Sequence, residues 1–322
     1  MITLEDIRAA AEVAAPYTIR SPQRDSPALS KRLGCQVSLK LEMHQHSGSF
    51  KTRGAFHQML ALGDDALGRG VVAVSGGNFA RAVAYCSGVL GVDAFLCMPE
   101  NAPEGSIAAT RDYGAEVELL PDAVAAFARA DELAAAGRSA LHPFDNREQI
   151  AGNGIVALEI MHDCPGLTDI IVSIGGGGLI AGVIAAVKAQ MPTVRVWGVE
   201  PVKAPTMQRA LAAGKIVNIV PGSLSATLGG PFVGQAALDL CQTHLEDLVL
   251  VSDMEMIAAQ QWFIQHEDLR PELAATSTLA AALRIKERLP ADAHLALLIC
   301  GCNDSDDDIA RYAGLLAAAE RA

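Results

Sequence analysis

Short apolar runs alternate with longer, alanine-rich segments along most of the chain. The short runs are typical of β-strands and lie at residues 37–41, 71–75, 94–98, 117–120, 170–174, 194–199, 248–251 and 296–300. The longer segments have helical length and lie at residues 78–90, 121–136, 178–190 and 272–288. Strands that alternate with helices imply right-handed crossovers and parallel sheets covered on both faces. We therefore predict an α/β fold with open, mostly parallel sheets flanked by helices.

The strand–helix units between about residues 70 and 140 form a self-contained set, with glycine-containing breaks before and after them. We predict that residues 69–140 form a small domain inserted into a larger one made of residues 1–68 and 141–322. Ligands of open α/β sheets bind outside the carboxyl ends of the strands. A ligand is therefore expected in the crevice between the two domains.

Composition narrows the possible functions. With 51% hydrophobic and only 4% aromatic residues, small aliphatic side chains build the interior, which suits helices packed on a parallel sheet. The formal charge of −12 argues against nucleic-acid binding, which needs clustered Lys and Arg. There is no signal-peptide pattern and no apolar stretch long enough to span a membrane. Seven scattered cysteines without metal-ligand spacing favour a reducing, cytoplasmic location and no metal site.

Lys51 is the first candidate for chemistry. It follows a Ser-Gly-Ser turn at residues 47–49 and the aromatic Phe50, and it precedes a predicted helix. The positive potential at a helix N-terminus favours the neutral, nucleophilic amine, and such a lysine can form a Schiff base with an aldehyde. A lysine considered alone, however, is usually a solvated surface charge, and that alternative stays open here.

A run of four glycines is the second candidate. Gly175, Gly176, Gly177 and Gly178 follow a strand-like run and open a helix, so their backbone amides and the helix dipole converge on one point. This pattern predicts a phosphate cradle but does not identify the phosphate. A dinucleotide is an alternative, since Glu200 ends the next strand as the acidic residue of such folds does. A second alternative is that the four glycines only form a tight turn between the strand and the helix.

A third loop, with Ser75, Gly76 and Gly77 followed by Asn78, also closes a strand and opens a helix. Its amides and the Asn78 side chain suit a carboxylate or a phenolic oxygen. An ordinary asparagine at a helix start would look the same in the sequence.

Together these segments resemble fold-type II pyridoxal-phosphate enzymes, whose fold is the tryptophan synthase β-like one with a smaller domain inserted in a larger one. The likeness is closest to the threonine/serine dehydratase and serine racemase branch. It rests on the Ser-Phe-Lys and Arg-Gly-Ala sequences at 49–51 and 53–55 and on the two glycine loops. Further pieces follow in the family's order at 142–145, 151–154, 198–201 and 300–303, so the resemblance covers almost the whole chain.

The resemblance implies a pyridoxal 5'-phosphate cofactor and a role for each matching residue. Lys51 would form the Schiff base and act as the base at the substrate Cα, with Phe50 packed by the cofactor ring. Asn78 would bind the phenolic oxygen. The phosphate would be held by Gly175, Gly176, Gly177 and Gly178, with Leu179 next in line. Cys300 would face the pyridine nitrogen. The amides of Ser75, Gly76 and Gly77 would receive the substrate carboxylate.

The implied reaction is dehydration of a β-hydroxy-α-amino acid to a 2-oxo acid and ammonia. Cys300 favours elimination, because a nearly neutral thiol does not hold the pyridine nitrogen protonated; a small core residue would equally suit that position. Racemases of this branch carry a serine where Gly76 stands, so racemisation is disfavoured. Racemase and β-replacement activities of the same fold remain alternatives. More distant ones are a nucleotide-binding oxidoreductase and a catalytically inactive ligand sensor.

Two departures from the family pattern concern the substrate, which would be threonine, serine or a bulkier amino acid. Phe79 replaces a polar family residue after Asn78 and could accommodate an apolar substrate such as 3-phenylserine, because aromatic pairs gain about 0.5–1.5 kcal/mol beyond area burial. Packing between the domains would explain Phe79 equally well. Glu272 either lines the pocket or starts a helix after Pro271. The expected partners are this amino acid and, by the family's habit, a second copy of the chain.

Overall fold

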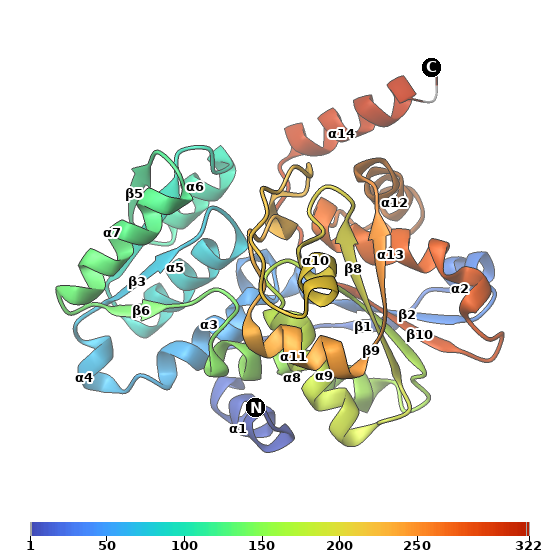
Figure 1. Ribbon diagram of the computed structural model, residues 1–322, viewed down its shortest axis with the longest axis horizontal. Coiled ribbons are helices and arrows are strands. Elements are labelled where there is room, and N and C mark those ends of the chain that lie inside the picture. Colours follow the sequence, from blue (N-terminus) through green and yellow to red (C-terminus); the bar gives the residue numbers. More distant parts are fainter. Residues whose placement is uncertain (1, 320, 322) are drawn as a thin grey trace.

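The computed structural model of the protein describes residues 2–319 and residue 321, which form two β-sheets flanked by helices (Figure 1). In spatial order the larger sheet consists of β1 (Gln23–Asp25), β2 (Gln36–Leu41), β10 (His294–Ile299), β7 (Asp169–Ser173), β8 (Arg195–Pro201) and β9 (Leu245–Val251). The smaller sheet consists of β5 (Glu116–Leu120), β4 (Ala94–Pro99), β3 (Val71–Val74) and β6 (Ser139–Leu141). Apart from the antiparallel pair β1–β2, neighbouring strands are parallel. The predicted fold class is confirmed.

Helices cover both sheets (Figure 1). In chain order the α-helices are α1 (Leu4–Ala14), α2 (Pro27–Leu33), α3 (Lys51–Leu60), α4 (Asp64–Leu67), α5 (Asn78–Leu90), α6 (Glu104–Asp112), α7 (Ala123–Ala135), α8 (Arg147–Asp163), α9 (Gly178–Gln190), α10 (Thr206–Ala213), α11 (Gln235–His244), α12 (Asp253–His266), α13 (Leu273–Arg284) and α14 (Asp306–Ala319). Short 3-10 helices are η1 (Glu42–His44), η2 (His46–Gly48), η3 (Ala226–Leu228) and η4 (Lys286–Arg288). Among the described residues, none of these helices is long and apolar enough to cross a membrane.

The predicted strands all appear at or near their expected positions, and α5 and α9 have the predicted bounds. Both helices begin directly after a glycine loop, which marks their first residue in the sequence. The predicted helix at 272–288 ends at Arg284 and continues as η4. Strands β1 and β6 were not predicted, because three residues are too few to show an alternating pattern.

Helix α3 links the cores of the two sheets. Its residues Ala55, Phe56 and Met59 are fully buried in the core of the smaller sheet, and the same helix packs against α8 of the larger one. The predicted domain boundaries at residues 69 and 140 therefore stay a prediction. Helix α3 lies between the sheets (Figure 1). Its first residue, Lys51, follows Phe50, which bonds the Cys300 carbonyl at the end of β10, and lies beside Phe79 at the start of α5.

Candidate active site

The turn before Lys51 is held against the carboxyl end of β10. Its Ser47 and Gly48 have positive φ angles of 59° and 75°. The N–H of Cys302 donates to the Gly48 carbonyl at 2.9 Å, and the N–H of Phe50 donates to the Cys300 carbonyl at 3.1 Å. A Cβ at position 48 would lie only 2.5 Å from the Asn303 side chain, so the glycine leaves room for that side chain. This contact fixes where α3 begins.

The Lys51 amine lies in a partly buried site between aromatic rings. Its Nζ donates a hydrogen bond to the Pro143 carbonyl at 2.7 Å and lies 5.2 Å and 5.7 Å from the ring centroids of Phe50 and Phe79. Burial lowers the pKa of Lys51 to about 8, although the nearby Cys300 and Glu272 groups act in the opposite direction. An amine with this pKa is partly neutral near pH 7 and can attack an aldehyde.

The four-glycine loop joins β7 to α9 and packs so closely against its neighbours that side chains would not fit there. Gly177 has a positive φ of 91° and caps α9. A Cβ at position 176 would lie 2.2 Å from the Phe144 ring, and one at position 178 would lie 2.6 Å from the Phe144 carbonyl oxygen. The loop therefore presents backbone amides at the N-terminus of α9, as an anion site requires. The neighbouring Leu179 is buried in the core of the larger sheet.

The loop after β3 lies at the start of α5, where Gly77 N–H donates to the Ser75 hydroxyl at 3.2 Å. Asn78 is buried and its amide group donates to both Glu272 carboxylate oxygens, at 2.8 Å and 2.9 Å. The Asn78 carbonyl oxygen accepts from the Asn303 amide at 2.7 Å. Asn78 thus connects α5 to residues of the larger sheet that are more than 190 positions away in sequence.

Phe79 and Cys300 are both buried beside Lys51. Phe79 belongs to the core of the smaller sheet, so it packs, and its ring also forms one side of the lysine site. Cys300 directly follows β10. Burial, reinforced by the Glu272 charge, raises the pKa of the Cys300 thiol well above its usual range, and the thiol is neutral as a result.

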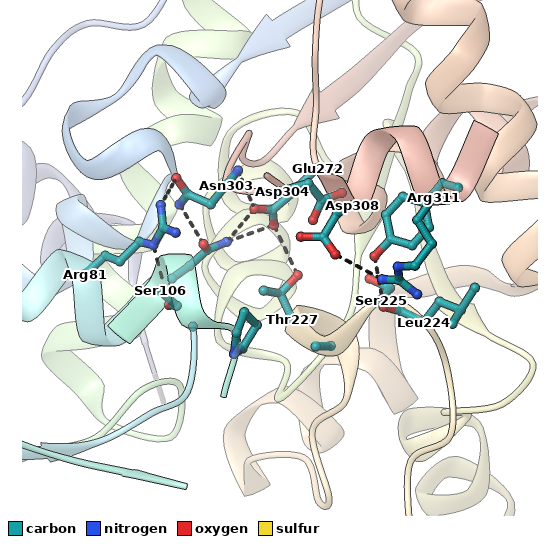
Figure 2. A pocket seen from close by; sticks show the side chains of 15 residues that line it. Arg81, Ser106, Leu224, Ser225, Thr227, Glu272, Asn303, Asp304, Asp308 and Arg311 are labelled. Carbon is teal, nitrogen blue, oxygen red and sulfur yellow. Dashed lines mark hydrogen bonds and ion pairs between the residues drawn. The ribbon is translucent and has the colours of Figure 1, made fainter. Parts of the chain in front are cut away.

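Glu272 occupies the wall of a cavity next to these groups (Figure 2). It is 2% exposed, and besides Asn78 its carboxylate accepts hydrogen bonds from the Thr227 hydroxyl and the Asn303 N–H, both at 3.1 Å. Its side chain does not cap α13; Asp304 accepts the Leu273 N–H at 2.7 Å instead. Glu272 therefore lines the cavity and is also the residue directly before the first turn of α13, so the two interpretations are compatible.

Sequence analysis did not single out several polar residues of this cavity. They are Arg81, Thr227, Asn303 and Asp304. Arg81 lies one helical turn beyond Asn78 on α5 and donates to the Asn303 side chain at 2.8 Å, a spacing that could have been noticed. Asn303 is the last residue of the 300–303 segment of the family likeness, but no role was predicted for it. Thr227 lies in a long connection with no recognisable pattern.

The residues brought together here fit a ligand that carries an aldehyde and a phosphate. Lys51 provides an amine of lowered pKa, and residues 175–178 provide an anion site made of backbone amides. Ser49, two residues before Lys51, is fully buried, and its hydroxyl has no hydrogen-bond partner among the described residues, so a ligand could supply one. Such a combination is typical of enzymes that use pyridoxal phosphate.

Comparison with known proteins identifies the family. Residues 15–301 match the family described as "Pyridoxal-phosphate dependent enzyme", and the chain belongs to it. Its cofactor is therefore pyridoxal 5'-phosphate. The chain is 37% identical over 97% of its length to a phenylserine dehydratase of Ralstonia pickettii, of which it covers 98%. It is 35% identical to the catabolic L-threonine dehydratase TdcB of Escherichia coli K12, over 88% of this chain and 87% of that one.

Solved structures agree with this assignment. The fold matches maize serine racemase with a TM-score of 0.92 at 27% identity, covering 100% of this chain and 99% of that one. It matches a threonine deaminase of T.th. with a TM-score of 0.89 at 35% identity, covering 94% of this chain and 99% of that one. The family resemblance inferred from the sequence is confirmed.

Proposed function

We propose that the protein is a carbon–oxygen lyase that converts a β-hydroxy-α-amino acid to a 2-oxo acid and ammonia. The observation that carries the proposal is the Lys51 amine, which lies beside the amide-rich start of α5 in a chain similar throughout its length to dehydratases. The cofactor of the family supplies a conjugated ring that withdraws the electron pair left at Cα when its proton is removed.

The chain's own groups divide the remaining work. Lys51 holds the cofactor covalently and, once released, takes the proton from the substrate Cα. Residues 175–178 and the N-terminus of α9 would bind the phosphate, and Asn78 would donate to the phenolic oxygen. The amides of residues 75–77 orient the substrate carboxylate. General base catalysis of this kind contributes roughly 10²–10⁴-fold.

Two residues favour elimination over other reactions of the family. The neutral Cys300 thiol would not keep a pyridine nitrogen protonated, which favours loss of a group at Cβ over reactions that need a protonated ring. Gly76 offers no hydroxyl for protonation of Cα from the second face. A Cβ at this position would lie 3.2 Å from the Cβ of Ala102, so even a serine there would be tightly packed. Racemisation is the second candidate because maize serine racemase shares the fold throughout.

Among the candidate substrates we favour a β-hydroxy-α-amino acid with an aromatic substituent, such as 3-phenylserine. The Phe79 ring lies 5.7 Å from the Lys51 amine, close enough for an aromatic substituent at Cβ to contact it. Turnover of L-threo-phenylserine, threonine and serine by the purified protein should then be highest for phenylserine. Equal or faster turnover of threonine would remove the role of Phe79 in substrate choice.

The function itself is tested by trapping the cofactor and measuring products. Borohydride reduction followed by peptide mass spectrometry should locate the cofactor on Lys51, and the wild-type protein should release equal amounts of 2-oxo acid and ammonia without a second substrate. Lys51→Ala should abolish both results. Lys188→Ala is the control, since that amine bonds carbonyl groups at the far end of α9 and should change neither. An adduct at another lysine would contradict the proposal.

We further propose that the active protein is a cytoplasmic homodimer. The support is the family's habit and the cysteines, which are all free in the structure. Light scattering of the purified protein measures the mass directly, and a mass near 33.6 kDa would contradict the dimer.

A further inference from the structure

We propose that Glu272 is the acid that protonates the departing β-hydroxyl group. The inference rests on the proposed dehydratase function and assigns it one further catalytic residue. Removal of hydroxide from Cβ requires a proton on the oxygen, because hydroxide is a poor leaving group. Lys51 already receives the proton from Cα, so a second group must supply this one.

Position is the first argument. Glu272 lines the same cavity as Gly77 and Asn78, the loop proposed to orient the substrate carboxylate (Figure 2). Its charge also acts on the Lys51 amine, which places it within electrostatic reach of the group that takes the proton from Cα. A substrate held between Lys51 and residues 75–77 therefore has the Glu272 carboxyl beside it.

The second argument is that Glu272 lacks a paired cation. Within the described part of the chain its carboxylate is bonded by an amide, a hydroxyl and a backbone N–H, but by no Lys or Arg side chain. Burial raises its pKa, which the hydrogen bonds from Asn78, Asn303 and Thr227 and the charge of Arg81 reduce only in part. Burial without a paired cation therefore favours the protonated form of this carboxyl.

The titratable and charged groups around Glu272 act in both directions. They lie on α3, on α5, at the end of β10, in the loop that follows it and on α14, and they are Lys51, Arg81, Cys300, Cys302, Asp304, Asp308, Arg311 and Tyr312. Asp304 carries the same charge as Glu272 when both are ionised. Burial and the Glu272 charge raise the pKa of Asp304 to about 7. Two carboxyl groups so arranged share protons, and their apparent pKa values belong to the pair.

Neighbouring groups can adapt to a protonated Glu272. The Thr227 hydroxyl is a donor to the carboxylate here and becomes an acceptor for a protonated carboxyl by rotation of its own hydrogen. If Asn78 turns its amide toward the cofactor, Glu272 loses donors that favour its ionised form, and its proton affinity rises. Binding of the cofactor and substrate would in this way favour protonation of Glu272.

Other acids of the site are less suited to the step. Asp304 uses its Oδ2 oxygen to accept the N–H of Leu273 and the amide of Gln260. Burial raises the pKa of the Cys302 thiol to about 11 and that of the Cys300 thiol further still, so neither gives up a proton readily. Glu272, by contrast, bonds the Asn78 side chain, which directly follows the loop proposed to bind the substrate carboxylate.

The step is balanced without any further reactant. Lys51 takes the Cα proton as the Cα–H bond breaks, and the electron pair of that bond forms the Cα=Cβ double bond. The Cβ–O bond breaks with its electron pair on oxygen, which takes the proton of Glu272 and leaves as water. Solvent protons entering through the cavity restore Glu272 for the next turnover.

A comparison of leaving groups tests the assignment. Glu272→Gln preserves the size and one acceptor oxygen but removes the transferable proton. We expect kcat for the hydroxy substrate to fall roughly 10²–10⁴-fold, the usual range for loss of a general acid. The kcat of the variant for elimination from 3-chloroalanine should stay within about threefold of the wild-type value, because chloride leaves without a proton. The remaining difference would reflect a change of rate-limiting step. The exposed Glu287→Gln is the matched control and should change neither rate.

A second measurement does not depend on the loaded enzyme. Carboxyl carbon NMR of glutamate-labelled apoenzyme, compared between the wild type and Glu272→Gln, should show one signal that titrates above the ordinary pKa of 4.5 and disappears in the variant. Thermal unfolding of the apoenzyme variant should match or exceed the wild type, which excludes a failure to fold.

The outcomes separate the inference from the function on which it rests. If the wild type dehydrates hydroxy substrates and Glu272→Gln slows both leaving groups equally, or neither, Glu272 is not the acid. If the carboxyl titrates at or below its ordinary pKa, the inference is also overturned. If the wild type eliminates from 3-chloroalanine but dehydrates no hydroxy amino acid, the proposed function is wrong and the inference is overturned with it.

Discussion

Two polar clusters contain residues close in sequence or in charge interaction to Lys51, and they differ in how their charges are paired. The ion cluster consists of Lys40, Glu42, Arg53 and Glu159. The cavity cluster consists of Asn78, Arg81, Glu272, Asn303 and Asp304. The first contains equal numbers of cations and carboxylates in direct contact. In the second, the described residues form no ion pair between Arg81 and a carboxylate.

The ion cluster has the properties of a structural element. Arg53 binds Glu42 and Glu159 at 2.8 Å each, and Lys40 binds Glu159 at 2.6 Å. The Arg53 guanidinium lowers the pKa of Glu42 despite complete burial of that carboxyl. Arg53 lies on the first turn of α3, two residues after Lys51, so the cluster anchors the start of this helix.

The cavity cluster has the properties of a functional site. Burial raises the pKa of both Glu272 and Asp304, and the cluster faces a cavity (Figure 2). Carboxyl groups with raised pKa values in a cleft are candidates for acid–base chemistry, whereas fully paired buried ions are usually structural. The contrast teaches that burial alone does not assign a role; the pairing of the charges does.

Breaking the ion cluster should have the largest effect. Arg53→Met leaves Glu42 and Glu159 buried with one cation fewer, and removal of one partner from a buried pair costs about 3–5 kcal/mol. Urea unfolding at pH 7 measures the loss of free energy of unfolding. Arg270→Met removes an exposed pair with Asp306 and should cost less than about 1 kcal/mol. A similar small loss in both variants would show that the cluster is not structural.

Neutralising the cavity cluster should stabilise the protein instead. The pKa of Asp304 is raised from 3.8 to about 7 in the folded protein, so its ionised form opposes folding. This cost is absent below about pH 3.8, develops as the pH rises, and is complete above about pH 7. Asp304→Asn keeps an oxygen for Leu273 and Gln260 and should raise the free energy of unfolding by roughly 1–3 kcal/mol at pH 8.

The gain from Asp304→Asn should shrink as the pH is lowered toward 4, which urea unfolding at several pH values measures. Asp306→Asn, at an exposed position nearby, is the control and should show no such dependence. A gain that is independent of pH would contradict the raised pKa.

The contrast between the clusters also marks what the sequence could reveal. Lys51 and the glycine loops could be singled out as candidates because neighbouring residues mark them: a turn, a strand end and a helix start. Glu272 was ambiguous, since Pro271 before it is equally typical of a helix start, and its side chain is placed by Asn78, 194 positions away. Thr227 and Asp304 gave no local signal. The ion cluster joins residues more than 100 positions apart and was not predicted either.

The smallest expected effect concerns Arg81, the one cation among the five residues of the cavity cluster. Its charge lowers the pKa of Glu272 through space, without a direct bond between the two. If Glu272 must be protonated for the β-hydroxyl to leave, kcat should fall as the pH rises through the pKa of Glu272. Arg81→Gln should therefore move this alkaline limb to higher pH, by about 1 pH unit or less.

Asp304→Asn provides the opposite change, because the Asp304 charge raises the proton affinity of Glu272 and its loss should move the limb to lower pH. The measurement is kcat against pH for the hydroxy substrate, with 3-chloroalanine as the reference whose rate lacks this limb. Because the two variants change the charge next to Glu272 in opposite directions, a general disturbance of the cavity cannot produce shifts of opposite sign. If both variants shift the alkaline limb of kcat in the same direction, or if 3-chloroalanine shows the same limb, the titrating group is Lys51 or another group rather than Glu272.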